Sequence, residues 1–102
     1  MRAIVDLCLV PLGVGISLSP YIAACQSILE SAGLEHRLHS YGTTIEGEWD
    51  EIFTAVGACH RRIHEMGAPR ITSSVRIGTR VDRSQTMSDK VKSVQALLEE
   101  RE

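Results

Sequence analysis

A short stretch near the middle of the chain, residues 39–50, restricts the fold more than any other part of the sequence. Thr43 to Glu46 is rich in residues that favour a β-strand. Glycines, which adopt backbone angles that other residues avoid, stand on both sides of it. After the second glycine an amphipathic helix begins with acidic residues, which suit the positive end of a helix dipole. The stretch therefore predicts a short strand with a corner at each end, followed at once by a helix.

A first strand is predicted at residues 2–10, where the side chains alternate in character. Successive side chains of a strand point to opposite faces. One face is fully apolar and should meet helices: Ala3, Val5, Leu7 and Leu9. The other face is mixed and carries Arg2, Ile4, Asp6, Cys8 and Val10. This mixed face predicts contact with a ligand or another subunit rather than with bulk water.

Two helices are predicted from their apolar periodicity. The first runs from about Pro20 to Ala32, with Ser19 as its N-cap and Gly33 as its stop. The second runs from Glu48 to about Met66 and has the stronger 3.6-residue period. The side chains expected to face inward are Ile22, Cys25, Ile28 and Leu29 in the first helix, and Trp49, Ile52, Phe53, Val56, His60 and Ile63 in the second.

The remaining elements are two more strands and a last helix. Residues 34–40 pair with the strand Thr43–Glu46 in a hairpin through the Tyr41-Gly42 corner, and residues 70–77 alternate as a fourth strand. Thr86, with Asp89 three residues later, predicts a capped last helix. The apolar side chains of this helix are expected to face inward: Val91, Val94, Leu97 and Leu98.

The order β-α-β-β-α-β, followed by one more helix, predicts an α+β fold of the ferredoxin-like kind, in one domain that spans residues 1–102. Two helices then cover one face of a four-stranded antiparallel sheet and leave the other face open. We therefore expect the sheets of different subunits to pack together, as dimers or tetramers. The last helix either covers the rest of the open face or docks on a neighbouring subunit.

Composition excludes several classes of protein. The net charge of −2 argues against a nucleic-acid-binding protein, which would carry a basic stripe. No run approaches the roughly 20 apolar residues of a membrane span. Three cysteines without metal-type spacing indicate reduced thiols and a cytoplasmic protein. We expect neither a cofactor nor membrane attachment.

The histidines and cysteines suggest two possible kinds of site, a metal site and a catalytic cysteine. His60 and His64 are one helical turn apart, which is the spacing of a metal-binding pair, but His60 lies on the apolar stripe and no third ligand is near in sequence. We therefore predict no metal site. The cysteines have no adjacent group that would lower a thiol pKa, so a catalytic cysteine is not expected either.

The densest group of polar side chains is Thr43, Thr44 and Glu46. Thr43 should point to the helices, and the other two to the open face or to a neighbouring subunit. Glu46 is either a solvated carboxylate or an anchor for a cationic or amino-bearing heterocycle. Tyr41 and Trp49 are candidates for a stacking wall, although Trp49 also suits the core.

Three further residues are candidate ligand contacts. His39 shares a strand face with Tyr41 and either lines a ligand pocket or is solvated. Arg76 belongs to a basic cluster that suits a phosphate or carboxylate, and shares the open face with Asp6, with which it either pairs or holds a charged ligand. Ser17, in the loop before the first helix, is predicted to contact a ligand in its own subunit or in a neighbour.

Residues 42–50, followed by a helix that contains His60, resemble the signature of the small thiamine-binding protein family. The resemblance extends over essentially the whole chain. It includes Val10-Pro11-Leu12-Gly13, the serines 17 and 19, and Gly67-Ala68-Pro69-Arg70-Ile71. Ile77-Gly78-Thr79-Arg80 is similar to the family's arginine motif at the end of a strand, and with Val81-Asp82 it is closest to the fungal branch. Many members have an acidic residue where Gly78 stands.

The resemblance implies a ferredoxin-like fold, assembly into dimers and tetramers through sheet packing, and binding of thiamine or its hydroxymethylpyrimidine part without catalysis. It also implies ligand contacts at Thr43, Thr44 and Glu46. Two alternatives remain open at this point. One is a regulatory or structural oligomer that senses another small metabolite, and the other is a hydrolase that uses His39 and Glu46.

Overall fold

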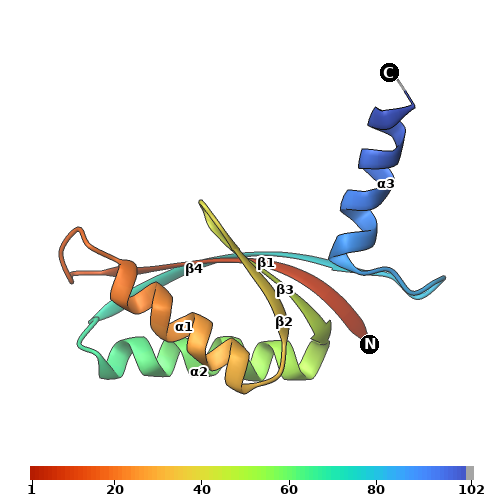
Figure 1. Ribbon diagram of the computed structural model, residues 1–102. Coiled ribbons are helices and arrows are strands. Elements are labelled where there is room, and N and C mark those ends of the chain that lie inside the picture. Colours follow the sequence, from red (N-terminus) through yellow and green to blue (C-terminus); the bar gives the residue numbers. More distant parts are fainter. Residues whose placement is uncertain (101–102) are drawn as a thin grey trace.

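The fold is built around a four-stranded antiparallel sheet (Figure 1). The computed structural model describes residues 1–100. In chain order the elements are β1 (Arg2–Leu12), α1 (Ser19–Ser31), β2 (Glu35–His39), β3 (Gly42–Glu48), α2 (Trp49–Glu65), β4 (Arg70–Thr79) and α3 (Met87–Glu99). The strands lie in the order β2-β3-β1-β4, which confirms the ferredoxin-like arrangement with an additional C-terminal helix. The last two residues of the predicted domain lie outside the described residues.

The core lies between the sheet and the two helices α1 and α2, which cover the same face (Figure 1). The apolar face of β1 is buried, as its alternation predicts. Across the core, α2 contributes the completely buried side chains of Ile52, Cys59 and Ile63, and α1 contributes Leu29. Burying one aliphatic side chain of this size stabilises the fold by about 1.5–3 kcal/mol. The periodicity of the two helices therefore identified their inward faces correctly.

Both core helices end in the same hydrogen-bonded turn. After α1, the amide of Gly33 donates to the carbonyl of Glu30, and the amide of Leu34 donates to that of Leu29. Gly33 has a φ of +71°, which supports its prediction as the residue that ends the helix. The predicted N-cap of α1 is wrong by one residue, because Leu18 holds that position and Ser19 is already helical.

Gly42 is required for a reason that differs from the predicted one. The hairpin turns at Ser40 and Tyr41, since His39 pairs with Gly42 in the β2–β3 register. Gly42 is thus the first residue of β3, and it does not have a positive φ. A Cβ atom at this position would lie 2.5 Å from the carbonyl oxygen of Leu7, which is closer than atoms can approach. Gly42 therefore permits β3 to approach β1.

We predict that Gly42→Ala destabilises the protein by about 1–3 kcal/mol, because the added methyl group forces the strands apart. Gly78→Ala is the matched control, since a Cβ there meets no atom nearer than 4.0 Å. Urea unfolding of both variants measures the difference. Equal losses of stability in the two variants would contradict the steric explanation.

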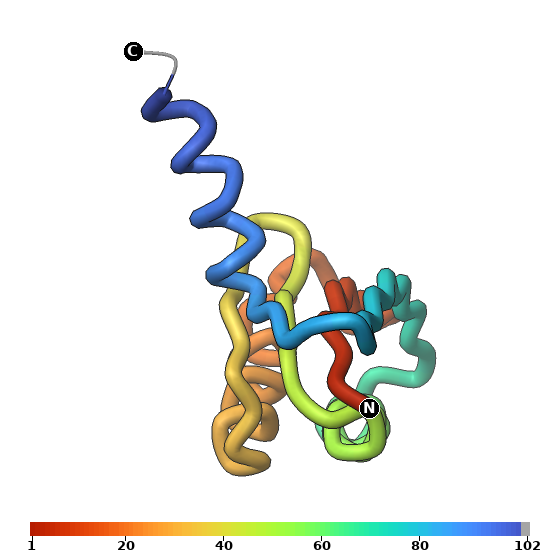
Figure 2. Tube along the Cα trace, turned by 90° about the vertical axis from the view of Figure 1, so that its right-hand side faces the viewer, coloured from red at the N-terminus to blue at the C-terminus, as the bar shows by residue number. Residues whose placement is uncertain are grey.

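α3 projects away from the body of the molecule (Figures 1 and 2). The prediction that its apolar side chains face inward is wrong: Val91, Val94, Leu97 and Leu98 are 50%, 56%, 62% and 53% exposed. The radius of gyration, 15.5 Å, accordingly exceeds the roughly 13 Å expected for a chain of this length. Periodicity identified an apolar face but not its partner, and within residues 1–100 nothing packs on most of this face.

Candidate functional site

A cavity of about 700 Å³ lies between α1, the second half of β1 and the tip of the β2–β3 hairpin. We call it the hairpin cavity. Its walls are mainly apolar and include Leu9, Leu18, Ile22 and Leu29. Its volume is within the range of small-molecule sites, which are mostly apolar with a few polar groups.

One side of the hairpin cavity is the free edge of β1. β3 pairs with β1 only as far as Leu7, whereas β4 continues to pair with it as far as Leu12. From Cys8 onward, the edge of β1 that faces the cavity has no neighbouring strand among the described residues. Such an edge presents peptide N–H and C=O groups that are available for hydrogen bonds.

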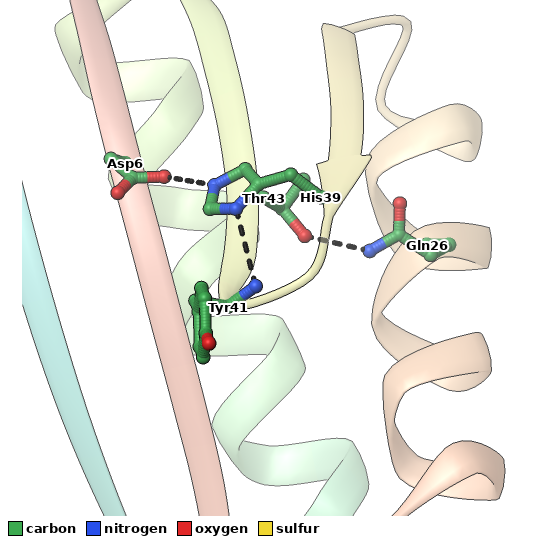
Figure 3. A network of polar contacts seen from close by, with 5 residues as sticks. All are labelled: Asp6, Gln26, His39, Tyr41 and Thr43. Atoms are coloured by element: carbon green, nitrogen blue, oxygen red, sulfur yellow. Dashed lines mark hydrogen bonds and ion pairs between the residues drawn. The ribbon is translucent and has the colours of Figure 1, made fainter.

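Gln26 and Thr43 form the main polar contact inside the cavity (Figure 3). The side-chain amide of Gln26 donates to the hydroxyl oxygen of Thr43 at 2.9 Å. Thr43 is only 6% exposed and points to the helices, as predicted. A glutamine amide has one acceptor oxygen and two N–H donors, so this contact leaves one donor and the acceptor of Gln26 for other partners.

Gln26 is not among the predicted site residues, although its position in the sequence is informative. Gln26 lies four residues after Ile22 and three before Leu29, and therefore on the inward stripe of α1. A polar residue on an apolar stripe often indicates a buried hydrogen bond or a binding site.

His39 lies at the mouth of the cavity and reaches across β3 to Asp6 on β1 (Figure 3). Its Nε2 atom is 2.6 Å from a carboxylate oxygen of Asp6, and its Nδ1 atom accepts a hydrogen bond from the amide of Tyr41 at 3.3 Å. The crossing is possible because the residue opposite His39 is Gly42, which has no side chain in the path. The Tyr41 amide fixes the tautomer, so Nε2 carries the proton that is donated to Asp6.

Tyr41 and Trp49, the candidate stacking residues, lie in different places. The Tyr41 side chain is 87% exposed at the hairpin tip, beside the cavity that it lines. Trp49 is half-buried and contacts Phe53, with 4.8 Å between the ring centres. Trp49 therefore belongs to the core, and it does not line the hairpin cavity.

Glu46 lies on the opposite face of the sheet from Thr43 and contacts the first residue of α3. Its carboxylate accepts a hydrogen bond from the backbone amide of Met87 at 2.9 Å, and only 9% of the residue is exposed. The negative charge is thus placed at the positive end of the α3 dipole. Glu46 lines a second cavity, of about 530 Å³, which we call the α3-base cavity.

The other predicted site residues also lie outside the hairpin cavity. Thr44 and Arg76 flank Asp6 on the open face of the sheet. The hydrogen bond of Asp6 is made with His39, and no ion pair joins it to Arg76. Ser17 is in the exposed loop before α1 and lines neither cavity. Of the predicted set, His39, Tyr41 and Thr43 line the hairpin cavity, whereas Thr44 and Arg76 lie on either side of Asp6, the partner of His39.

The histidines and cysteines within residues 1–100 are not gathered into a metal-type cluster. No group of three or more potential ligands (His, Cys, Asp or Glu) is close enough to hold a metal within residues 1–100. Cys25 and Cys59 are buried free thiols, and a side-chain hydrogen bond with Cys25, together with burial, raises the pKa of Cys59. His60 contacts the hydroxyl of Ser73, and His64 contacts the carbonyl of Ala68.

We predict that protonation of His60 destabilises the fold. Partial burial, with a smaller effect of His64, lowers the pKa of His60 below its usual 6.5. The neutral form is therefore favoured in the folded protein. Its contribution to stability is complete above pH 6.5 and is lost as the pH falls through the lowered pKa. The free energy of unfolding, measured between pH 5 and 8, should decrease less toward acid in His60→Gln. Parallel curves for the two proteins would refute this prediction.

The family of proteins described as thiamine-binding protein matches residues 5–95 of the chain. The chain belongs to this family. A UPF0045 protein of Synechocystis sp. is 65% identical, with 97% of this chain and 82% of that protein covered. A UPF0045 protein of Eremothecium gossypii, named ECM15, is 41% identical, with 96% and 94% covered. Membership confirms the resemblance of the sequence to this family.

Solved structures agree with the fold. The hypothetical protein MJ1052 of Methanocaldococcus jannaschii has a TM-score of 0.85 at 28% identity, with 92% of this chain and 96% of that chain covered. A candidate thiamine biosynthesis/salvage protein of Thermotoga maritima has a TM-score of 0.79 at 23% identity, with 92% and 99% covered. In the part of the chain that the structure describes, every helix is too short or too polar to cross a membrane.

Proposed function

We propose that the protein binds thiamine or its hydroxymethylpyrimidine part in the hairpin cavity, and that it does so without catalysis. Three findings support the proposal. The chain belongs to a family described as thiamine-binding, and a protein of the same fold is described as a candidate for thiamine biosynthesis or salvage. The observation that carries the proposal is the Gln26–Thr43 pair in an otherwise apolar cavity.

The aminopyrimidine ring of thiamine fits the chemistry of this pair. The ring presents an amino donor beside a ring-nitrogen acceptor, in the plane of an apolar heterocycle. A glutamine amide presents the complementary acceptor and donor, as it does to adenine in nucleic-acid recognition. The apolar walls of the cavity would cover the two faces of the ring. The free edge of β1 offers further peptide groups to the ring nitrogens.

The thiazolium cation of thiamine would lie at the mouth of the same cavity. His39 lines this cavity, and its ring is hydrogen-bonded to Asp6, which lies beside the cavity on the open face of the sheet. The side chains of Asp6 and His39 are 42% and 41% exposed. The Asp6 carboxylate supplies a negative charge near the opening, and the exposed Tyr41 ring supplies an aromatic surface for a cation.

Two neighbouring threonines give a sharp test of the site. We predict that Thr43→Val weakens thiamine binding about tenfold, because it removes the hydroxyl that positions Gln26. Gln26→Leu should weaken it at least as much. Thr44→Val is the matched control, because it makes the same change on the opposite face of the sheet. Calorimetric titration of folded, ligand-free protein with thiamine measures all four affinities.

The ligand contacts expected from the sequence alone predict a different result in the same titrations. These contacts are Thr43, Thr44 and Glu46, and the last two of them lie on the open face. If Thr44→Val and Glu46→Gln abolish binding and Thr43→Val does not, the ligand lies on the open face and the hairpin cavity is not the site. If no form of thiamine binds at all, a metabolite-sensing oligomer becomes the leading hypothesis.

A non-catalytic role fits the arrangement of the reactive groups. The hydrolase hypothesis needs His39 and Glu46 together, but these residues contact different partners, Asp6 and Met87. His60 contacts the hydroxyl of Ser73, yet neither residue lines the hairpin cavity, and no carboxylate among residues 1–100 bonds to His60.

We place the protein in the cytoplasm, because its free thiols suit the reducing conditions there.

We further propose that the protein assembles into dimers or tetramers. Most of the apolar stripe of α3 is not covered by any other part of residues 1–100, and the open face of the sheet carries the half-buried apolar side chains of Ile4 and Val10. Both surfaces are typical of interfaces between subunits.

A charge on the α3 stripe should reduce the size of the assembly. We predict that Leu97→Glu shifts the molar mass, measured by light scattering during gel filtration, toward that of a monomer. Ala96→Glu adds the same charge on the opposite side of the helix and should leave the mass unchanged. A wild-type protein that elutes as a monomer at all concentrations would disprove assembly through α3.

A further inference from the structure

The α3-base cavity concentrates positive charge on a chain whose net charge is −2. Four basic side chains line it: Arg2, Arg80, Arg83 and Lys90. Arg2 is the first residue of β1, Arg80 and Arg83 belong to the loop after β4, and Lys90 lies in the first turn of α3. Like charges repel one another, so their convergence from three parts of the chain has an electrostatic cost that negative charge among them would offset.

Nearby carboxylates compensate only part of this charge. Glu46 is the one carboxylate among residues 1–100 that lines the cavity, and one of its oxygens accepts the amide of Met87. Outside the lining, Glu48 lies close enough to Arg2, and Asp89 close enough to Arg83, for an electrostatic attraction. Asp82 does not line the cavity, but it binds the Arg80 guanidinium through two hydrogen bonds of 2.6 and 2.9 Å. Within residues 1–100, Arg2, Arg83 and Lys90 have no hydrogen bond or ion pair through their charged groups.

The hydrogen bonds of Arg80 fix the orientation of its guanidinium, and the residue still lines the cavity. Its Nε and Nη2 atoms face Asp82, and its Nη1 atom donates to Gln85 at 3.2 Å. A guanidinium held in this way loses little conformational freedom when it binds a further group. Thr79 and Ser84 add hydroxyl groups to the same lining.

We propose that the α3-base cavity binds an anion of the phosphate type. Arginine binds phosphate oxygens in a bidentate manner, and lysine binds them as a point charge. The hydroxyl groups of Thr79 and Ser84 add further donors, and Glu46 is the one carboxylate in the lining among residues 1–100. A cavity of about 530 Å³ has room for a phosphate ester or a diphosphate.

This site is separate from the proposed thiamine site. Glu46 and Ile4 line the α3-base cavity from the open face of the sheet, whereas Thr43 lines the hairpin cavity from the helix face. No residue lines both cavities. A phosphate in the α3-base cavity is therefore a second ligand, and the inference does not depend on the proposed thiamine binding.

A bound anion would also connect two parts of the molecule. Arg2 belongs to the sheet, whereas Lys90 belongs to α3, which otherwise projects away from it (Figure 2). An anion between them adds charge-assisted contacts to the hydrogen bonds that already join the start of α3 to the sheet, from Met87 to Glu46 and from Arg37 to Ser88. Phosphate binding thus fixes the direction of α3.

Calorimetric titration with inorganic phosphate and with pyrophosphate, in a chloride buffer, tests the site. We expect saturable binding to the wild-type protein. Lys90→Gln and Arg83→Gln should each weaken it about tenfold, because each removes a charge-assisted contact. Lys92→Gln is the matched control: it makes the same change on the same helix, but Lys92 does not line the cavity, so the affinity should change less than about twofold.

A second arm identifies the source of the phosphate group. Thiamine monophosphate that binds no more tightly at this site than inorganic phosphate would indicate free phosphate, and tighter binding that Lys90→Gln weakens would indicate a phosphate ester. Either result supports a phosphate site. Absence of saturable binding to a folded wild-type protein, or equal effects of Lys90→Gln and Lys92→Gln, would overturn the proposal. Neither of these results would affect the test of thiamine binding with Thr43→Val.

Discussion

The pairing of β1 with its two neighbours is the interaction on which the rest of the structure depends. β1 lies in the interior of the sheet, with β3 on one side and β4 on the other. Its helix-facing side chains form the floor of the core, and its other face carries Asp6. Because β3 stops pairing at Leu7 whereas β4 continues to Leu12, one edge of β1 is left free, and the hairpin cavity forms along it. The difference in length between the neighbouring strands therefore creates the candidate site.

The elements, and the inward faces of the sheet and of α1 and α2, could be predicted from the sequence because each is local in origin. Alternation placed Val5 and Ile45 against the helices, and the 3.6-residue period placed Ile52 and Ile63 against the sheet. The capping box of Thr86 and Asp89 is also present. These features depend on residues that are close in sequence, and so the sequence contains the information needed to recognise them.

The candidate site was only partly predictable, because it depends on contacts between distant residues. Alternation correctly separated Thr43 from Thr44 and Glu46, but it did not show that the two faces lead to different cavities. That Glu46 contacts the start of α3, 41 positions later, follows only from the path of the chain after β4. In the same way, the partner of Thr43 is Gln26, which belongs to another element. The apolar stripe of α3 illustrates the same limit, since a period reveals a face but not what covers it.

The position of α3 also determines which part of a single subunit is least stable. A helix of 13 residues is marginal in water when it stands alone, and this one is tied to the body near its first residues only. Local unfolding should therefore begin at its C-terminal end, where Leu97 and Leu98 are exposed, and progress toward Met87. Proteases cut preferentially at such fraying ends. The segment with the most exposed apolar surface is thus also the one most easily removed from an isolated subunit.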